Sequence, residues 1–452
     1  MKIILVGGGK VGTALARQLS EEDHNVTIVD TNKARVEHLT ESYDVLGIVG
    51  NGSSITTLAE AGIEDADVFI AVTGSDELNL LCCMFAKKAG HCHAIARVRN
   101  PSYSHELDFI KKQIGISAII NPEMAAAKEI SHLLRFPGAS KIDTFADGRV
   151  RLIKFALTAE QGLDGVAIRE IPTRLKSDIL VCAVERSGGV IIPNGNFVLQ
   201  AGDKINLTAS HSEIEKFFRT IGLFRTGVKS VMILGGGRMA YYLAKALILS
   251  HVRVKIIELD YKRCEYLCEA LPEAVVIHGD GTDKETLQEE GLEKTDALVC
   301  LTGMDEENIV VALYAKAKKV SKVIAKINRI SFDEILDALD IDGFISPKMI
   351  AANNIVRYVR AMQNSAGSSN VETLHKLVNE QIEALEFKVR EKSSVVGVPL
   401  KDLKTKSEVL VATIIRNGRV IIPGGNDMIE VDDSVIIITR NKHLTDLKDI
   451  LK

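Results

Sequence analysis

Short runs of apolar residues alternate with amphipathic stretches from residue 3 to residue 98. The runs are rich in valine and isoleucine, and the stretches between them, such as 13–22, place apolar residues at helical spacing. Buried parallel strands separated by helices produce this alternation. It predicts an α/β fold with a Rossmann-like parallel sheet, and the same alternation returns at 231–327.

The sequence contains an internal repeat that covers each half of the chain. Three unrelated motifs recur at a nearly constant offset, and such constancy indicates a tandem duplication. The matched segments are IILVGGGKVGTALARQL at 3–19 with VMILGGGRMAYYLAKAL at 231–247, VTGSDELN at 72–79 with LTGMDEEN at 301–308, and VIIP at 190–193 with VIIP at 420–423.

Each copy then changes character. Residues 150–210 and 384–440 contain paired β-branched runs, and Asn417-Gly418 between two such runs predicts a tight hairpin. We predict two small α+β domains with mostly antiparallel pairing. The expected domains are 1–136, 140–222, 228–362 and 371–452, with boundaries at 137–140, near Thr226-Gly227, and at a flexible linker, 364–370.

Composition narrows the class of protein. The 452 residues are 46% apolar and 26% charged with a net charge of −4, which excludes a mainly disordered chain and a basic nucleic-acid-binding protein. No apolar stretch approaches the roughly 20 residues of a membrane span, and MKIILVGGG does not resemble a signal peptide. Seven scattered cysteines form no disulfide framework. We expect a cytoplasmic protein without lipid insertion.

A glycine motif opens the first copy. Gly7, Gly9 and Gly12 follow the first strand and precede a helical pattern. The first glycine permits a tight turn, the second lets a pyrophosphate approach, and the third allows close packing, while the helix N-terminus supplies amide donors. Asp30 ends the next strand, close to the usual place of a ribose-binding acid, where it can accept from a ribose hydroxyl and repel a 2′-phosphate. These features predict NAD or another adenosine nucleotide rather than NADP.

The second copy repeats the motif as Gly235, Gly237 and Ala240, and Glu258 ends its next strand at the same spacing from the motif as Asp30 in the first copy. We therefore predict a second adenosine-nucleotide site. The alternative is a Rossmann sheet that retains its glycines only for turn geometry and packing.

Polar pairs follow later strands in both copies. They offer acceptors at the carboxyl edge, where open parallel sheets bind ligands, but ordinary turn and loop roles stay open. Asp76 and Asp305 precede helical patterns and are expected to be N-caps. The pairs are Asn51-Gly52 and Asp280-Gly281 after the third strands, and Thr73-Gly74 and Thr302-Gly303 after the fourth.

Cations end the fifth strands, as Arg97 and Lys326. Each can pair with a phosphate or with an acid across a subunit interface, and the sequence favours neither. Glu123 follows Pro122 at a helix start, so it either complements the helix dipole or lies beside a phosphate at an interface.

Catalytic and metal sites are not predicted. A dehydrogenase needs an acid or base on a second domain, and neither small domain offers such a set. The spacing of His91-Cys92-His93 near Cys82 matches no zinc pattern, and no GxxxxGK[ST] loop is present. We expect no enzyme, with an NAD-dependent oxidoreductase carrying duplicated cofactor domains as the alternative.

Together these motifs resemble the RCK, or KTN, family, the domains that regulate potassium conductance. The GGG turn, the third-strand glycine pair, VTGxDExN, the proline-initiated helix and the VIIP module occur in the family's order over essentially the whole chain. The resemblance implies a cytoplasmic regulatory subunit, peripheral at the inner face of the membrane, bound to a membrane potassium-translocating subunit. It also implies a homotetramer and control by NAD(H) or ATP/ADP. Uptake is expected, and the sensor of a potassium/proton antiporter is the alternative.

The resemblance carries site residues over one at a time. Asn51 departs from the family's usual Asp, and Lys348 from its usual Glu, so a phosphate-linked metal role would be confined to the first copy. The implied nucleotide-binding residues are Gly7, Gly8, Gly9, Lys10, Val11, Asp30, Asn51, Gly52, Thr73, Gly74 and Arg97 in the first copy, and Gly235, Gly236, Gly237, Arg238, Met239, Glu258, Asp280, Thr302, Gly303 and Lys326 in the second.

Overall fold

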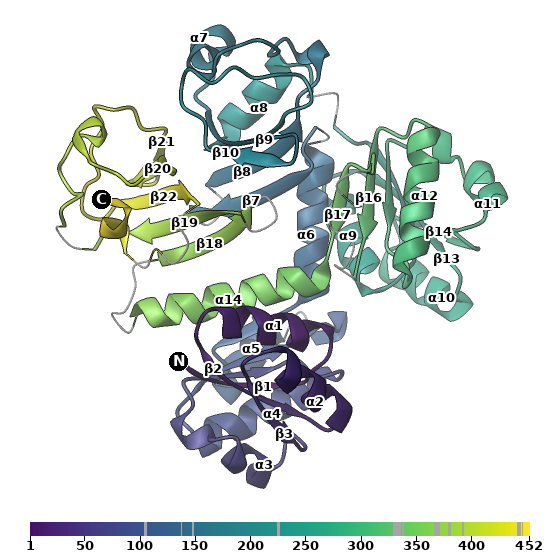
Figure 1. Ribbon diagram of the computed structural model, residues 1–452. Helices are drawn as coiled ribbons and strands as arrows, with labels where there is room; N and C mark the ends of the chain where they lie inside the picture. Colours follow the sequence, from purple (N-terminus) through teal and green to yellow (C-terminus); the bar gives the residue numbers. More distant parts are fainter. Residues whose placement is uncertain are drawn as a thin grey trace. The chain divides into compact units, whose positions relative to one another are not determined.

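Two parallel six-stranded sheets contain the alternating apolar runs, one in each copy (Figure 1). The computed structural model describes residues 1–103, 106–136, 138–146, 149–223, 227–328, 336, 339–365, 371–377, 381–390, 393–440, 444 and 446–452. The first sheet has the order β3-β2-β1-β4-β5-β6. Its strands are β1 (Lys2–Val6), β2 (Asn25–Asp30), β3 (Leu46–Val49), β4 (Val68–Ala71), β5 (His93–Arg97) and β6 (Ala118–Ile120).

Helices connect these strands and cover the sheet. All four residues of β4 are buried, as expected for a central strand with helices on both faces. Helix α1 begins directly after the glycine turn, and its N-cap Gly9 makes no side-chain capping bond. The helices are α1 (Lys10–Glu21), α2 (Lys33–Ser42), α3 (Ile55–Glu60), α4 (Asp76–Ala89), α5 (Leu107–Ile114) and α6 (Pro122–Arg135).

The second sheet repeats this topology as β14-β13-β12-β15-β16-β17. The predicted strands are present in both copies, and β6 and β17 are additional, because strands this short give no periodic signal. The strands are β12 (Ser230–Leu234), β13 (Arg253–Glu258), β14 (Val275–His278), β15 (Ala297–Cys300), β16 (Lys322–Lys326) and β17 (Gly343–Ile345), and the helices are α9 (Arg238–Leu249), α10 (Tyr261–Ala270), α11 (Lys284–Glu289), α12 (Asp305–Ala317) and α14 (Pro347–Ser365).

The two Rossmann domains form one compact unit, Met1–Ser131 with Lys229–Val359. Side chains link them reciprocally. Gln18 on α1 donates to Asn353 on α14 at 3.0 Å, and Asn121, just before α6, donates to the Tyr242 hydroxyl on α9 at 3.0 Å. Each copy's last helix therefore begins against the first helix of the other copy, and Figure 1 shows α14 beside α1.

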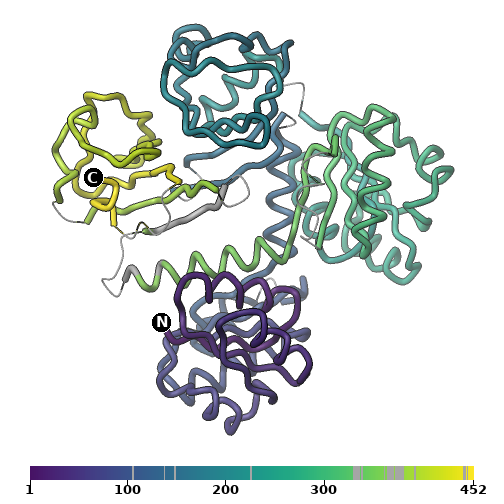
Figure 2. The backbone as a smooth tube through the Cα atoms, in the orientation of Figure 1, coloured from purple at the N-terminus to yellow at the C-terminus, as the bar shows by residue number. Residues whose placement is uncertain are grey.

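A second unit, His132–Val228 with Arg360–Lys452, contains the predicted α+β modules. Its sheets are antiparallel, with orders β10-β9-β11-β8-β7 and β18-β19-β22-β20-β21. The backbone trace in Figure 2 shows each copy running from its Rossmann sheet through one long helix into its module. The elements are β7 (Lys141–Phe145), β8 (Val150–Ala156), α7 (Ile171–Leu175), β9 (Leu180–Arg186), β10 (Gly189–Ile191), β11 (Lys204–Ser210) and α8 (His211–Thr220), then β18 (Val371–Leu377), β19 (Ile382–Lys388), β20 (Val409–Arg416), β21 (Arg419–Ile421) and β22 (Ser434–Thr439).

The two modules share a hydrophobic core. Leu152 and Cys182 of the first module are fully or almost fully buried in one cluster with Ile382 and Ile436 of the second. The predicted hairpin at Asn417-Gly418 is confirmed, because both residues have positive φ, 49° and 78°, between β20 and β21.

The boundary segments are only partly described. Of the linker predicted at 364–370, Asn364 and Ser365 belong to helix α14, and 366–370 lie outside the described residues. Pro137 and Thr226 also lie outside them.

Candidate nucleotide site

The glycine turn of the first copy has the geometry that the motif requires. Gly7 has a φ of +104°, which glycine adopts readily, and a Cβ at Gly12 would lie only 1.9 Å from the Gly7 carbonyl oxygen. Helix α1 therefore starts in close contact with the turn, and its first amides have no side-chain cap. Such amides, at the positive end of the helix dipole, are donors for a phosphate.

Asp30 is fixed directly behind this turn. Its carboxylate accepts from Gly8 N at 2.7 Å and from Asn32 N at 2.8 Å, and Arg35 Nη1 lies 3.7 Å away. Asp30 is 9% exposed, so the strand end and the turn hold it in one orientation. A carboxylate has more than two acceptor positions, so it can still accept from a ribose hydroxyl.

A cavity of about 480 Å³ opens at this edge of the sheet. Its volume lies within the range of small-molecule sites. All predicted residues of the first copy line it except Gly8, whose amide instead binds Asp30. Sequence reasoning missed Arg35, although a cation in the first turn of the helix after the acid was a readable signal. The lining residues are Val6, Gly7, Gly9, Lys10, Val11, Val29, Asp30, Thr31, Arg35, Gly50, Asn51, Gly52, Val72, Thr73, Gly74, Leu78 and Arg97.

Arg97 brings a cation into this cavity. Burial, helped by neighbouring Arg99, lowers the pKa of Arg97 to about 10, although Glu123 and Asp76 oppose the shift. The guanidinium donates to the Thr73 carbonyl, but its Nε is buried and has no hydrogen-bond partner among the described residues. An anion in the cavity would provide one.

The motif VTGxDExN has a structural explanation. Asn79 is fully buried; its side chain accepts from Thr73 N at 2.7 Å and donates to the Arg97 carbonyl at 2.9 Å, so it joins the ends of β4 and β5. Asn308 makes the same bonds to Thr302 and Lys326, at 3.0 Å each. Both copies therefore hold the fifth-strand cation in place through this asparagine.

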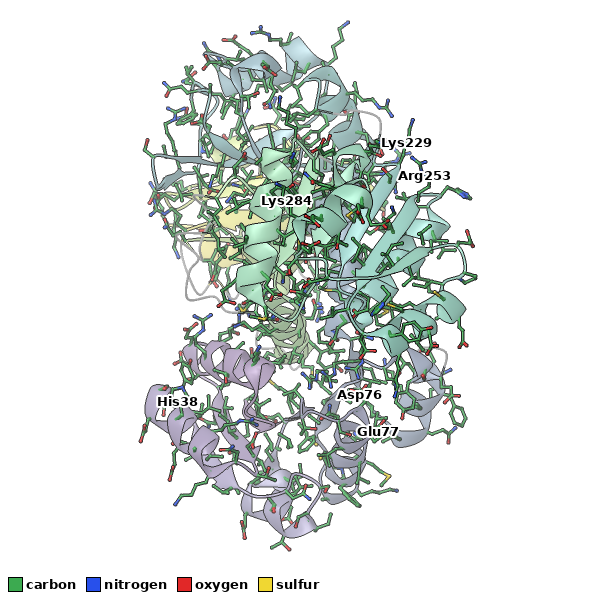
Figure 3. The ribbon with its side chains drawn as sticks, turned by 90° about the vertical axis from the view of Figure 1, so that its right-hand side faces the viewer. His38, Asp76, Glu77, Lys229, Arg253 and Lys284 are labelled. Carbon is green, nitrogen blue, oxygen red and sulfur yellow. The ribbon has the colours of Figure 1, made fainter. Side chains whose placement is uncertain are left out.

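The N-cap prediction for Asp76 and Asp305 is wrong. The N-caps are Ser75 and Met304, and each aspartate is the first residue of its helix. The Asp76 carboxylate accepts from Arg99 N and Asn100 N, both at 2.8 Å, and therefore fixes the loop after β5 (Figure 3 labels Asp76 and Glu77 at the start of α4). Asp305 accepts from Asn328 N at 2.8 Å.

The third-strand pairs act as turns in both copies. Asn51 accepts from Ser53 N at 3.0 Å, and Asp280 accepts from Thr282 N at 2.8 Å. Asn51 also lines the cavity, so in the first copy the turn and a ligand-facing position coincide.

The second copy has the same turn and acid. Gly235 has a φ of +89°, and Gly236 N donates to the Glu258 carboxylate. Helix α9 begins at Arg238, with Met239 next, and its N-cap Gly237 again makes no side-chain capping bond. Lys326 donates to the Leu301 carbonyl at 3.0 Å, and the Thr302-Gly303 pair follows β15.

Charged groups of the two copies meet between the Rossmann domains. Burial lowers the pKa of Lys326, Lys10 of the other copy lowers it further, and Asp305 and Glu123 raise it. Arg238 likewise contributes to lowering the pKa of Arg97. Glu123 lies 3.9 Å from Arg99, and its Oε2 is buried without a hydrogen bond among the described residues. The turn cation of each copy thus acts electrostatically on the other copy's fifth-strand cation.

Metal-type clusters and membrane-spanning helices are both absent from the part of the chain that the structure describes. No three His, Cys, Asp or Glu side chains gather there as a potential metal site. Nor do the described helices include one with the length and apolar character of a membrane span.

Fold and site together define a class: a protein with tandem Rossmann domains, each with a dinucleotide-type glycine turn, and paired α+β modules. The TrkA-N domain family matches residues 3–122 and 231–347, and the TrkA-C domain family matches residues 152–222 and 384–452. The chain therefore belongs to the TrkA family of potassium uptake proteins.

Full-length relatives agree with this assignment. The chain is 32% identical over 453 residues to "Trk system potassium uptake protein TrkA homolog" of Archaeoglobus fulgidus, covering 100% of both. It is 33% identical to "Trk system potassium uptake protein TrkA" of Vibrio alginolyticus, covering 98% of this chain and 96% of the relative.

Solved structures share the fold. "GsuK channel bound to NAD" has a TM-score of 0.64 at 18% identity, covering 97% of this chain and 76% of that one. "Crystal Structure of the GsuK RCK domain" has a TM-score of 0.64, also at 18% identity, and covers 97% of this chain and 92% of that one.

Proposed function

We propose that this protein is the nucleotide-sensing regulatory subunit of a Trk-type potassium uptake system. It would act at the cytoplasmic face of the membrane through a potassium-translocating membrane partner, as a homotetramer whose Rossmann domains form a ring of eight. The full-length relatives named for Trk potassium uptake support the system. The observation that carries the sensing role is the cavity formed by the glycine turn, Asp30 and Arg97.

NAD(H) is the proposed ligand, with ATP and ADP as competitors for the same turn. Asp30 and Glu258 would accept from a ribose hydroxyl, the first amides of α1 and α9 would hold phosphate oxygens, and Arg97 and Lys326 would neutralise charge. The residues fit such a group because the start of α1 has no side-chain cap, and because Arg97 Nε has no hydrogen bond among the described residues. A bound dinucleotide would supply charge and contacts that favour one arrangement of the domains.

Regulation would follow from differential affinity. A ligand shifts a conformational equilibrium only as far as it binds one state more tightly, and coupling of about 1–3 kcal/mol per site is usual. Because Lys10 and Arg238 act on cations of the opposite copy, charge bound at one turn changes the electrostatic energy of the interface between the Rossmann domains. The antiporter sensor would use the same device with another membrane partner.

We propose that the protein carries out no turnover. An oxidoreductase needs an acid or base beside the nicotinamide. The described lining of the first cavity contains no His, Tyr or Cys, and its lysine, Lys10, begins α1, where we assign it to the phosphates. Steady oxidation of NADH by the purified protein with a small organic substrate would contradict this proposal.

Binding measurements test the proposed sites. We expect Asp30→Ala to weaken nucleotide binding to the first copy, and Glu258→Ala to the second, by roughly 10- to 100-fold, the loss of one hydrogen bond to a charged group. Asp30→Asn keeps one of the two oxygens that accept from backbone amides, so comparing its thermal unfolding with that of Asp30→Ala separates folding from binding. Glu41→Ala, an exposed acid on α2, is the matched control. Unchanged affinity for NADH, ATP and ADP in both variants would exclude these sites.

A transport assay tests the function. The purified chain is added to vesicles containing the multi-span potassium transporter, and rubidium flux is measured with NADH, ATP and ADP. We expect the flux to depend on the nucleotide, and the dependence to diminish in the Asp30→Ala and Glu258→Ala variants. A flux indifferent to both protein and nucleotide would refute the regulatory role.

A further inference from the structure

A second cavity, of about 380 Å³, lies on the other side of the first glycine turn. Its polar side chains come from both Rossmann domains: Lys10 and Thr13 from α1, Arg35 and His38 from α2, and Lys348 from α14 of the second copy. Figure 3 labels His38 on its helix. The described lining includes no acidic residue. The cavity is therefore built for an anion.

The corresponding place in the second copy keeps two cations, Arg238 at the position of Lys10 and Arg263 at that of Arg35, but differs at other positions. The duplication sets Tyr241 and Tyr266 where the first copy has Thr13 and His38. The two tyrosine rings lie 6.3 Å apart, and the Arg263 guanidinium stacks 4.5 Å above Tyr266. Aromatic rings thus occupy the positions whose small or basic counterparts line the first-copy cavity.

The charge at the helix start differs too. Lys348 follows Pro347 at the start of α14, and Glu123 follows Pro122 at the start of α6. Lys348 lines the cavity beside the first copy's turn, whereas Glu123 lies in the electrostatic range of Lys326 and Tyr242 in the second copy. Lys348 therefore adds a cation beside the first turn, whereas its counterpart Glu123 is a carboxylate that lies 3.9 Å from Arg99.

We propose that the first copy alone carries a second phosphate-binding subsite, formed by Lys10, Arg35, His38 and Lys348. This inference deepens the proposed function and rests on it. Lysine and arginine make charge-assisted hydrogen bonds to phosphate, and a histidine ring N–H donates in either charge state. Thr13 adds a hydroxyl.

The two cavities of the first copy adjoin. Gly9, Lys10 and Arg35 line both, so a nucleotide on the turn can extend a further phosphate into the second cavity. A free phosphate can occupy the same place. In either case the two nucleotide sites of one chain differ in ligand preference, because the first binds one further phosphate, either of the nucleotide or free.

The experiment uses variants of residues that line only the second cavity, Lys348→Glu and His38→Gln. Lys33→Met is the matched control, since Lys33 is on α2 but its side chain is 76% exposed and paired with Glu37. All are made in the full chain with the second site weakened by Glu258→Ala. Calorimetry then measures binding of ADP, ATP, tripolyphosphate and orthophosphate.

We expect Lys348→Glu to weaken ATP about tenfold and ADP less than about threefold, with a smaller effect of His38→Gln and none of Lys33→Met. That result assigns the subsite to a nucleotide phosphate. If the variants instead abolish binding of orthophosphate or tripolyphosphate and leave the ratio of the ATP and ADP affinities unchanged, the subsite is assigned to free phosphate.

Equal affinities of the variants and Lys33→Met for all four probes would overturn the subsite, while nucleotide binding that depends on Asp30 would leave the proposed function intact. If the parent binds no nucleotide, the proposed function fails. Tripolyphosphate then tests the subsite separately. Binding to the parent that Lys348→Glu abolishes supports the subsite, and binding that the parent lacks or that Lys348→Glu retains overturns it.

Discussion

Gly12→Ala tests whether the close contact between the glycine turn and helix α1 sets up the first nucleotide site. The added Cβ would lie 1.9 Å from the Gly7 oxygen and 2.9 Å from its carbonyl carbon. Ordinary contact begins near 3.4 Å, so turn and helix must separate by roughly 1.5 Å. Both neighbours are backbone atoms, which no rotamer change can move away.

This displacement has a cost in folding and a larger one in binding. Overpacking of this kind destabilises by about 1–3 kcal/mol. The first amides of α1 would also move away from the phosphate, and the loss of one charge-assisted hydrogen bond weakens binding roughly 10- to 100-fold. Affinity for ADP in the first copy should therefore fall by at least about tenfold in a protein that still folds.

The second copy provides the matched control, because Ala240 stands at the position of Gly12. Ala240→Gly removes a buried methyl group and introduces no overlap, so we expect a loss of only about 1 kcal/mol. Thermal unfolding and calorimetry with ADP measure both variants. Wild-type melting and wild-type affinity in Gly12→Ala would refute the reasoning, as would a larger effect of Ala240→Gly.

Three further predictions concern stability. Arg186→Gln should destabilise the first α+β module by about 3–5 kcal/mol in thermal unfolding, because Asp203 is 1% exposed and loses its bonds to Arg186 at 2.7 and 2.8 Å. Burial alone would raise the pKa of Asp203, but Arg186 and Gln200 N lower it. The wild type should therefore lose this stability as pH falls through that pKa, and the variant should not. Burial lowers the pKa of Lys322 to about 8, although Asp342 opposes the shift. Between pH 8 and 10.5 the unfolded state therefore binds more protons than the folded state, and the free energy of unfolding should rise with pH there. Lys322→Met should abolish this rise, and a pH profile identical to that of the wild type would contradict the assignment. Tyr242→Phe removes hydroxyl bonds to Asn121 and to the Arg99 carbonyl, both 3.0 Å, and should cost about 1–2 kcal/mol and speed proteolysis between the Rossmann domains, whereas Tyr241→Phe serves as control.

The sequence was sufficient for the fold because its signals are local. Alternating Val and Ile runs require parallel strands covered by helices, and Asn417-Gly418 requires a hairpin turn. The glycine spacing and Asp30 also predicted which residues gather at one sheet edge, since the carboxyl ends of parallel strands meet there.

Very short strands, and residues with more than one possible role, could not be predicted from the sequence. The brief strands β6 and β17 have no periodicity, and the roles of Asp76 and Asp305 depend on backbone amides that follow the next strand of the sheet. A helix cap and a loop anchor use the same residue type next to the same helix, so only the fold distinguishes them.

The amino-acid sequence by itself therefore determined the duplication, the two Rossmann sheets and the residues of each glycine turn, because strand periodicity and turn conformation are properties of neighbouring residues. Only the tertiary structure decided that Lys348 stands beside the first turn and Glu123 near the second copy's Lys326. Those neighbours belong to different copies of the duplicated unit, and they meet because each copy's last helix begins against the other copy, a contact that no local pattern encodes.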